Sequence, residues 1–365
     1  MSYYRINLTP VETYFFGGEK HDATGETINY FTVSEEWPQQ STLFGFTRYC
    51  LLHLKGLLNS GRRLNEEARA LVGSTGFNLS ADVLPDSTIK NISKLYFSKQ
   101  DQPYIFAPKD LNYSITEKYG RLLFVRDGEL IVSKGLDDNL YMMPVDYFNR
   151  TQSIDVKIFP VSKIIESVRS TGNEKSFEDD RDEMYYVQET KKLTDDWSFM
   201  YECEIDGELQ IPENLLLPFG GEKKIFRVDI EKIDKLTEVE DIEIKKKLIT
   251  KDIRQLFGIY CISDIIFDMT SVVSPDLAIS KSKSFRYFSS DISKTSNYYR
   301  FSSSNQKENN YSGLVRSKKY NLIARGSVFY YFNEITRNEV AELITSNKQY
   351  QAIGFNQLIK ILLVQ

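Results

Sequence analysis

The stretch from Trp37 to Leu58 constrains the fold more than any other part of the sequence, because it joins a turn to an amphipathic helix pattern. Pro38 ends an extended segment, and Ser41 or Thr42 is placed to cap the first N–H groups of the helix. Apolar side chains then recur at helical spacing, which predicts that one face of the helix packs on a sheet. These side chains are Leu43, Phe46, Cys50, Leu54 and Leu57.

The start of this predicted helix is a candidate anion site. Unpaired N–H groups and the positive end of the helix dipole favour a phosphate at Gln39, Gln40, Ser41 and Thr42. Arg48, further along the helix, can add positive charge. The alternative interpretation is a capped core helix that binds no ligand.

A second candidate site is a five-residue string that occurs twice. Phe16-Gly-Gly-Glu-Lys20 returns as Phe219-Gly-Gly-Glu-Lys223, about half of the chain away, which hints at two related halves. Each glycine pair either forms an ordinary β-turn or places backbone N–H groups against phosphates. The second alternative gives these candidate contacts: Gly17, Gly18, Lys20, Gly220, Gly221, Lys223 and Lys224.

Composition limits what such sites can bind. The chain has 365 residues and a formal net charge of −5, so a nucleic acid would need a local basic groove within a mildly acidic protein. Its three cysteines are far apart in the sequence, which indicates free thiols in a reducing cytosol. No apolar run approaches the ~20 residues of a membrane span, and no signal peptide opens the sequence. We therefore expect a soluble, cytoplasmic protein.

Residues 281–320 form the most distinct shift in composition. Nine basic residues and only two acidic ones occur there, interleaved with tyrosine and phenylalanine. This mixture predicts a loop that orders on single-stranded RNA, with Arg286 and Arg300 among its contacts. The alternative is a flexible insertion that touches nothing.

Weaker patterns predict the remaining elements. Alternation of apolar residues favours a strand at the N-terminus, and Asp110 is expected to cap a turn. His53, close to the apolar stripe of the first helix, is expected to be structural. Further predicted elements are a short helix stopped by Gly73, a hairpin turning at Asp127-Gly128, helix from Ile230 to Phe257, a strand from Tyr320 to Phe332 interrupted at Gly326, and a last strand from Leu358 to Val364.

Four ordered strings carry a resemblance to a known family. Pro38-Gln-Gln-Ser-Thr-Leu-Phe-Gly45 resembles the Pro-x-x-Ser-x-x-x-Gly element that opens the first helix of RAMP proteins, which are RNA-binding subunits of CRISPR effector complexes. The other three are similar to strings of the type III-B (Cmr) RAMP subunits that cap the 5′ end of crRNA. They are Leu8 to Phe16, Tyr104 to Leu111 and Leu217 to Lys223.

This resemblance implies an α+β fold with two ferredoxin-like (RRM-like) domains, residues 1–150 and 151–365, the second carrying the insertion at 281–320. It also implies three partners, namely the 5′ tag of crRNA, the large polymerase-like subunit and the adjacent backbone RAMP subunit. A looser likeness adds Arg169, Arg325 and Gly326 as candidate RNA contacts. Residues 22–29 would project over the guide RNA, or would be only a solvated turn.

Catalysis is not supported by the sequence. General acid–base or metal chemistry usually requires histidines, cysteines or clustered carboxylates at defined spacing, and no such spacing is visible. His21 is the one candidate for a ribonuclease histidine, without a visible partner. We therefore expect no catalytic residue, no metal and no cofactor. A crRNA-processing endoribonuclease and a structural adaptor that does not touch RNA remain as alternatives.

Overall fold

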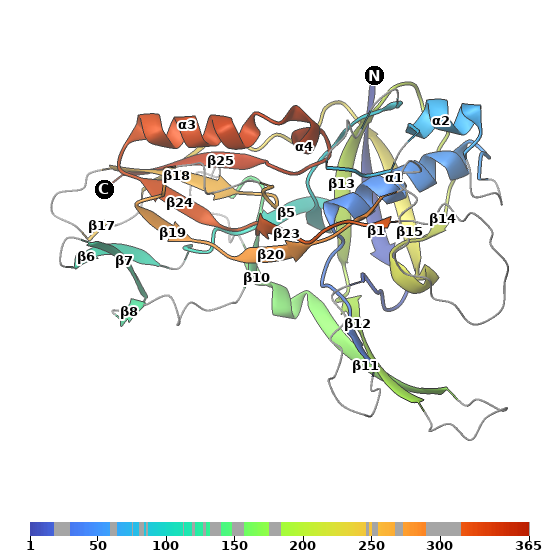
Figure 1. The fold of residues 1–365 in the computed structure, drawn as a ribbon, viewed down its shortest axis with the longest axis horizontal. Coiled ribbons are helices and arrows are strands. Elements are labelled where there is room, and N and C mark those ends of the chain that lie inside the picture. Colours follow the sequence, from blue (N-terminus) through green and yellow to red (C-terminus); the bar gives the residue numbers. More distant parts are fainter. Residues whose placement is uncertain are drawn as a thin grey trace.

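The computed structural model describes residues 1–17, 30–58, 64–74, 76–79, 84, 87–111, 113–118, 121–126, 129–131, 140–147, 157–174, 184–245, 248–249, 255–266, 273–289 and 315–364. Over these residues the protein is mostly β-structure with few helices, and most strand pairs are antiparallel (Figure 1). None of the helices in these ranges is long and apolar enough to cross a membrane.

The first sheet has nine strands and contains the N-terminus. Its order is β10-β9-β5-β4-β13-β1-β15-β14, and β3 also pairs with β13. Strands from both sides of residue 150 belong to it, so a division at 150/151 falls within this sheet. The strands are β1 (Ser2–Pro10), β3 (Ile89–Ile92), β4 (Tyr96–Lys99), β5 (Gln102–Phe106), β9 (Tyr141–Pro144), β10 (Phe159–Pro160), β13 (Trp197–Ile205), β14 (Leu215–Pro218) and β15 (Ile225–Ile233).

Helix α1 (Gln40–Leu54) packs on this sheet as its apolar stripe predicts. Leu43, Phe46 and Cys50 are buried, and the alternation of buried residues along β1 confirms the predicted N-terminal strand. The predicted cap is wrong, because Gln39 occupies the N-cap position and Ser41 and Thr42 lie in the first helical turn. Helix α2 (Glu66–Val72) begins at an Asn65 cap and stops at Gly73, as predicted.

The second sheet has five strands in the order β16-β25-β18-β24-β19, and helix α3 contacts three of them. The apolar side of α3 packs on the sheet through Val340 and Ile344, next to Ile259 and Tyr331. The predicted last strand is confirmed as β25. The predicted strand interrupted at Gly326 is confirmed as two strands, β23 (Tyr320–Ile323) before the glycine and β24 after it. The elements are β16 (Ile242–Lys245), β18 (Gln255–Cys261), β19 (Leu277–Ile279), β24 (Val328–Tyr331), β25 (Leu358–Val364), α3 (Glu334–Thr345) and α4 (Lys348–Ala352).

The helix predicted between Ile230 and Phe257 is wrong. The described residues of this region form the end of β15, then β16, β17 (Leu248–Ile249) and the start of β18. The helical spacing arose because apolar residues of separate strands followed one another along the chain. Pairing with β1, β6 and β25 in three different sheets decided the structure instead.

Smaller sheets extend from the two large ones. A three-stranded sheet, β11-β12-β2, projects from the body of the molecule as a long hairpin (Figure 1). The predicted hairpin is confirmed as β7 and β8, whose turn lies outside the described residues. The elements are β2 (Tyr30–Val33), β6 (Ser114–Lys118), β7 (Arg121–Arg126), β8 (Glu129–Ile131), β11 (Ile165–Glu174), β12 (Met184–Leu193), β20 (Ser282–Phe285), β21 (Phe288–Ser289), β22 (Val315–Arg316), β23 (Tyr320–Ile323), and the short turns η1 (Val161–Lys163) and η2 (Gly221–Lys223).

Candidate nucleic-acid interface

The two glycine-containing strings meet in space. The N–H of Gly221 donates to the carbonyl of Phe15 at 2.7 Å, and the Phe16 and Phe219 rings lie 5.2 Å apart. A further ring contact of 4.7 Å joins Phe219 to Phe46 of α1. Segments more than two hundred residues apart therefore pack together against the first helix.

Close approach of the backbone explains the glycine at position 220. Its φ of +81° lies in the left-handed region, and a Cβ there would lie 2.7 Å from the Phe15 carbonyl oxygen. Glu222 and Lys223 also have positive φ, at 56° and 53°. The backbone at Lys223 is therefore in a left-handed conformation, and its side chain is exposed.

The segment before α1 joins this turn to the β11–β12 hairpin. Gly17 forms an isolated antiparallel bridge with Ser34, and the Ser34 N–H donates to the Glu189 carbonyl of β12 at 2.8 Å. Gln188 of the hairpin also donates from Nε2 to Glu222 in the second glycine turn. The helix start, both glycine strings and the hairpin base thus share one region of the molecule.

Charged side chains at the hairpin base pair with one another. Glu189 accepts from Lys191 Nζ at 2.8 Å and from Arg169 Nε at 2.9 Å. These hydrogen bonds, from Lys191 first and then Arg169, lower the pKa of Glu189 to about 2. Arg169 remains 71% exposed, so the predicted contact of its outer nitrogens with RNA stays a prediction.

Lysines from different strands surround the carboxylate just before α1. Burial raises the pKa of Glu36, while Lys191 of β12 and Lys283 and Lys281 of the β20 segment oppose that rise. No sequence pattern predicts this cluster, because Lys191 is far from the 281–320 segment along the chain. Positive charge from two sheets therefore lies at the helix start.

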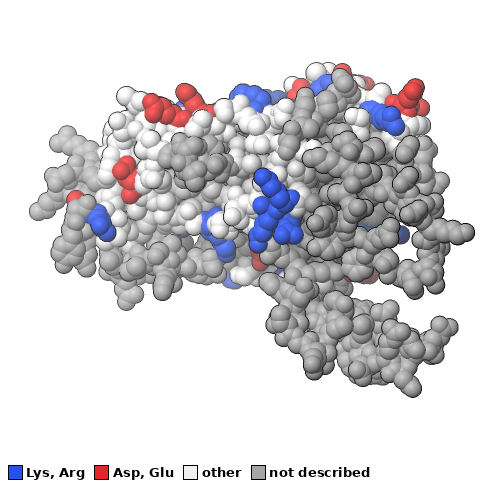
Figure 2. All heavy atoms as spheres, in the orientation of Figure 1, with Lys and Arg blue, Asp and Glu red and all other residues white. Residues whose placement is uncertain are grey.

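A basic patch with aromatic rings lies at the ends of β20 and β23. The patch is defined by the exposed residues Lys281, Arg286, Lys318 and Lys319, and the view in Figure 2 has a group of basic side chains at the place of β20 and β23 in Figure 1. The Tyr287 and Tyr320 rings stack at 6.0 Å, and Lys318 lies over Tyr320 at 5.1 Å. Cations beside stacked aromatic rings suit a nucleic acid, and Arg286 stays a predicted contact.

The side chains of Gln40 and Arg48, both predicted to contact RNA, donate hydrogen bonds within the protein instead. Gln40 is 1% exposed, and its Nε2 donates to the Ser93 carbonyl at 2.6 Å. Arg48 donates to the carbonyls of Val72 and Gly73 at 2.9 and 3.1 Å. Arg48 thus links α1 to the C-terminal end of α2, and these two nitrogens are not available to a phosphate.

Arg325 and Gly326 are also structural. Arg325 is 3% exposed and makes a bidentate ion pair with Asp264, from Nε at 3.1 Å and from Nη2 at 3.0 Å. Gly326 has a φ of +85° and exchanges backbone hydrogen bonds with Cys261 and Lys109. Long-range partners hold both residues in the interior, so neither lies on the exposed surface, and their contact with RNA stays a prediction.

Several predictions fall outside the described residues. They concern Gly18, Lys20, His21, Arg300 and residues 22–29, together with most of the 281–320 segment. Gln39, Ser41 and Thr42 are half-buried at the helix start, and Lys224 is half-buried beside Lys223, so these remain predicted contacts. His53, expected to be structural, is exposed and lies beside the Tyr49 ring.

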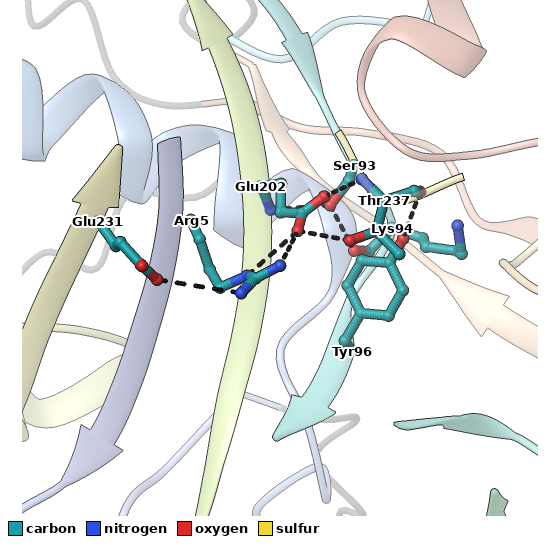
Figure 3. Close-up of polar contacts among 7 residues, drawn as sticks. All are labelled: Arg5, Ser93, Lys94, Tyr96, Glu202, Glu231 and Thr237. Atoms are coloured by element: carbon teal, nitrogen blue, oxygen red, sulfur yellow. Dashed lines mark hydrogen bonds and ion pairs between the residues drawn. The ribbon is translucent and has the colours of Figure 1, made fainter. Parts of the chain in front are cut away.

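A buried polar cluster between the two large sheets was not foreseen (Figure 3). Glu202 of β13 is fully buried and accepts from Arg5 Nη2 at 3.1 Å and from the Thr237 N–H and Oγ1 at 2.5 and 2.7 Å. The Tyr96 hydroxyl donates to the Thr237 carbonyl at 3.2 Å. Because its oxygens are already engaged, Glu202 fixes the segment between β15 and β16 and offers no free base.

Lys94 extends this link to the second sheet. Its Nζ donates to Gln357 Oε1 at 3.2 Å, just before β25, and lies 4.8 Å from the centre of the Tyr96 ring. Asp110 is likewise buried and accepts from the Tyr330 hydroxyl at 2.5 Å, in agreement with a structural role. Among the described residues, no group of three His, Cys, Asp or Glu side chains is placed to hold a metal ion.

Comparisons with known proteins give a likeness to solved structures. No family model matches the sequence, and no curated protein matches it. A chain in the cryo-EM structure of the type III-B Cmr-beta bound to cognate target RNA is 14% identical, with a TM-score of 0.47 over 97% of this chain and 96% of that chain. A chain in the structure of Cmr-beta bound to cognate target RNA and AMPPnP, state 1, is 12% identical, with a TM-score of 0.45 over 98% of each chain. Likenesses at this level assign no function.

Proposed function

We propose that this chain is a non-catalytic RNA-binding subunit of a type III-B (Cmr) CRISPR effector complex, and that it holds the 5′ tag of crRNA. The observation that carries the proposal is the convergence of three separate segments. The start of α1, the glycine turn at residues 219–224 and the base of the β11–β12 hairpin meet around Ser34 to Glu36. The N–H groups at the start of α1 and lysines from distant parts of the chain are the kinds of group that bind a phosphate backbone, whereas the Gly221 N–H is already engaged by Phe15.

The strand order of the first sheet supports a ferredoxin-like half. Strands β15, β1, β13 and β4 lie side by side, and all three pairs are antiparallel. In chain order these are the last, first, third and second strands of a βαββαβ unit, with α1 as the first helix. The strand insertions between β4 and β13 are additions to this unit.

The second sheet supports a second half of the same kind. Strands β25, β18, β24 and β19 have the same order and are also antiparallel throughout. Here α3 takes the place of the second helix, between β24 and β25. Two related halves are a suitable frame for a site that lies on more than one sheet.

In this proposal the RNA backbone runs from the glycine turn towards the basic patch. Lys223 and Lys224 contact phosphates, while Arg286 and Lys318 lie near the partly exposed Tyr320, whose ring is available to a base. The large polymerase-like subunit and the adjacent backbone RAMP subunit are the proposed protein partners.

A binding series tests the proposal. A labelled crRNA transcript with its repeat-derived 5′ tag is titrated with the wild-type chain, with a Lys223→Ala/Lys224→Ala variant, and with Lys235→Ala as a control on an exposed side chain. The double variant should weaken binding and lower the salt slope by about two, because each lost phosphate contact removes about one unit. No binding by the wild-type chain would indicate a protein–protein adaptor, and defined cuts in the RNA would indicate a nuclease.

A further inference from the structure

Three buried N–H donors, on Trp37, Lys283 and Arg325, are linked through the Trp37 and Phe106 rings just before α1. Trp37 Nε1, Lys283 Nζ and Arg325 Nη1 are each shielded from solvent, and none has a hydrogen-bond acceptor among the described residues. Lys283 Nζ is 5.6 Å from the centre of the Trp37 ring, which in turn lies 4.8 Å from the Phe106 ring. Arg325 Cζ lies 5.4 Å from that same Phe106 ring. Lys283 therefore lies over the Trp37 ring and Arg325 over the Phe106 ring, and the third donor belongs to the Trp37 ring itself.

Such a cluster is unusual in a folded protein. Most buried polar groups have a partner, because a buried donor without an acceptor is destabilising. Trp37, Lys283 and Arg325 come from three separate segments of the chain. A missing acceptor that all three donors share is the simplest explanation.

The neighbouring carboxylates do not supply that acceptor. Asp264 accepts hydrogen bonds from Arg325 Nε and Nη2, and Arg325 Nη1 has no acceptor among the described residues. Burial alone would raise the pKa of Asp264, but the charges of Arg325 and then Lys283 hold it well below its usual range. Glu35 lies 3.9 Å from Lys283 Nζ, which is an ion pair but too long for a hydrogen bond.

We propose that Trp37, Lys283 and Arg325 bind a phosphate-class oxyanion of low charge. An oxyanion brings several acceptor lone pairs and few protons, whereas a water molecule would bring two protons that themselves need acceptors. Lys191 and Lys281 add to the charges of Lys283 and Arg325. Glu35, Glu36 and Asp264 offset most of that positive charge, which disfavours a highly charged ligand. The ligand enters on the side of Lys283, whose side chain is 15% exposed beside a Glu35 that is 35% exposed.

Oxyanion binding by Trp37, Lys283 and Arg325 does not depend on RNA binding by this chain. Free inorganic phosphate and a phosphodiester of bound RNA offer the same oxygen atoms to the three donors. A chain that binds no RNA can still bind phosphate here, and loss of this site leaves Lys223 and the basic patch in place.

Calorimetric titration of the full chain with inorganic phosphate, against chloride at equal ionic strength, tests the site. Trp37→Phe keeps the ring and removes one donor, and Lys283→Met keeps the side-chain length and removes another. Each change should weaken phosphate binding about tenfold or more, since a hydrogen bond to a charged group contributes at least that factor. Lys235→Met, on an exposed side chain, should change it less than twofold.

Saturable phosphate binding that both variants lose supports the site. Absence of saturable binding, or equal affinity in the wild-type chain and both variants, would overturn it and leave an ordered water as the occupant. The source of the oxyanion follows from competition. Phosphate that displaces crRNA from the wild-type chain but not from Trp37→Phe identifies an RNA phosphate, and phosphate that binds beside crRNA identifies free phosphate; both results support the site.

Discussion

Replacing Glu202 by glutamine should destabilise the protein strongly although it leaves the shape of the side chain nearly unchanged. Glu202 is 0% exposed, and its carboxylate accepts from Arg5 Nε and Nη2 and from two donors of Thr237 (Figure 3). Glutamine presents one oxygen and an NH₂ group, so an N–H would face a donor and Arg5 would lose its buried counter-ion. We expect a loss of about 3 kcal/mol in the free energy of unfolding, near the lower end for breaking a buried ion pair, because Arg5 keeps some solvent contact.

Urea denaturation of the wild-type chain, Glu202→Gln and Glu231→Gln measures this effect. Glu231 is the matched control, because it pairs with the same Arg5 at 3.9 Å while its side chain is 66% exposed. Its change should cost less than about 1 kcal/mol, as exposed ion pairs do. A Glu202→Gln variant within 1 kcal/mol of the wild-type chain would refute the claim that this cluster joins the two sheets.

Three further outcomes are expected. Gly220→Ala should lower stability and RNA affinity, because its Cβ would lie 2.7 Å from the Phe15 oxygen, whereas Gly207→Ala has a similar φ of +98° with open space around it; equal effects in the two variants would contradict this reasoning. Arg48→Met should cost about 2 kcal/mol through two lost hydrogen bonds and leave crRNA affinity unchanged, in denaturation and binding assays; a large loss of affinity would restore Arg48 to the RNA site. Burial lowers the pKa of Lys94 from 10.5 to about 8. Between these two pH values the unfolded chain still binds a proton that the folded chain has released, so the free energy of unfolding should rise with pH. Lys94→Met should lack that rise.

The local patterns of the chain predicted its local structure well. The alternation at Tyr4, Ile6 and Leu8 and the helical stripe through Leu43 and Phe46 each describe one element facing one core, and both were confirmed. The helix predicted from Ile230 to Phe257 was wrong, because the apolar residues of this region belong to strands of three sheets. Their spacing along the chain therefore does not describe the face of a single element.

The candidate site depended on contacts that no local pattern contains. Arg325 resembled a free cation in the sequence, but its partner Asp264 lies sixty-one residues earlier in the chain. The contact of the Gly221 N–H with the Phe15 carbonyl could only be suspected from the repeated string. Lys191 was missed because its place depends on long-range pairing of β12 with β2 and with Tyr14. Residue type therefore indicated the kind of ligand, whereas tertiary pairing decided which residues remain available to it.

Crosslinking of crRNA to this chain in the assembled effector, with adducts mapped by mass spectrometry, tests the central claim most directly. Adducts are expected on residues 34–39, 219–224 and 281–289, which the proposed function places along one RNA path. Adducts confined to the exposed side of α3, or RNA retained by the complex with no adduct on this chain, would contradict it.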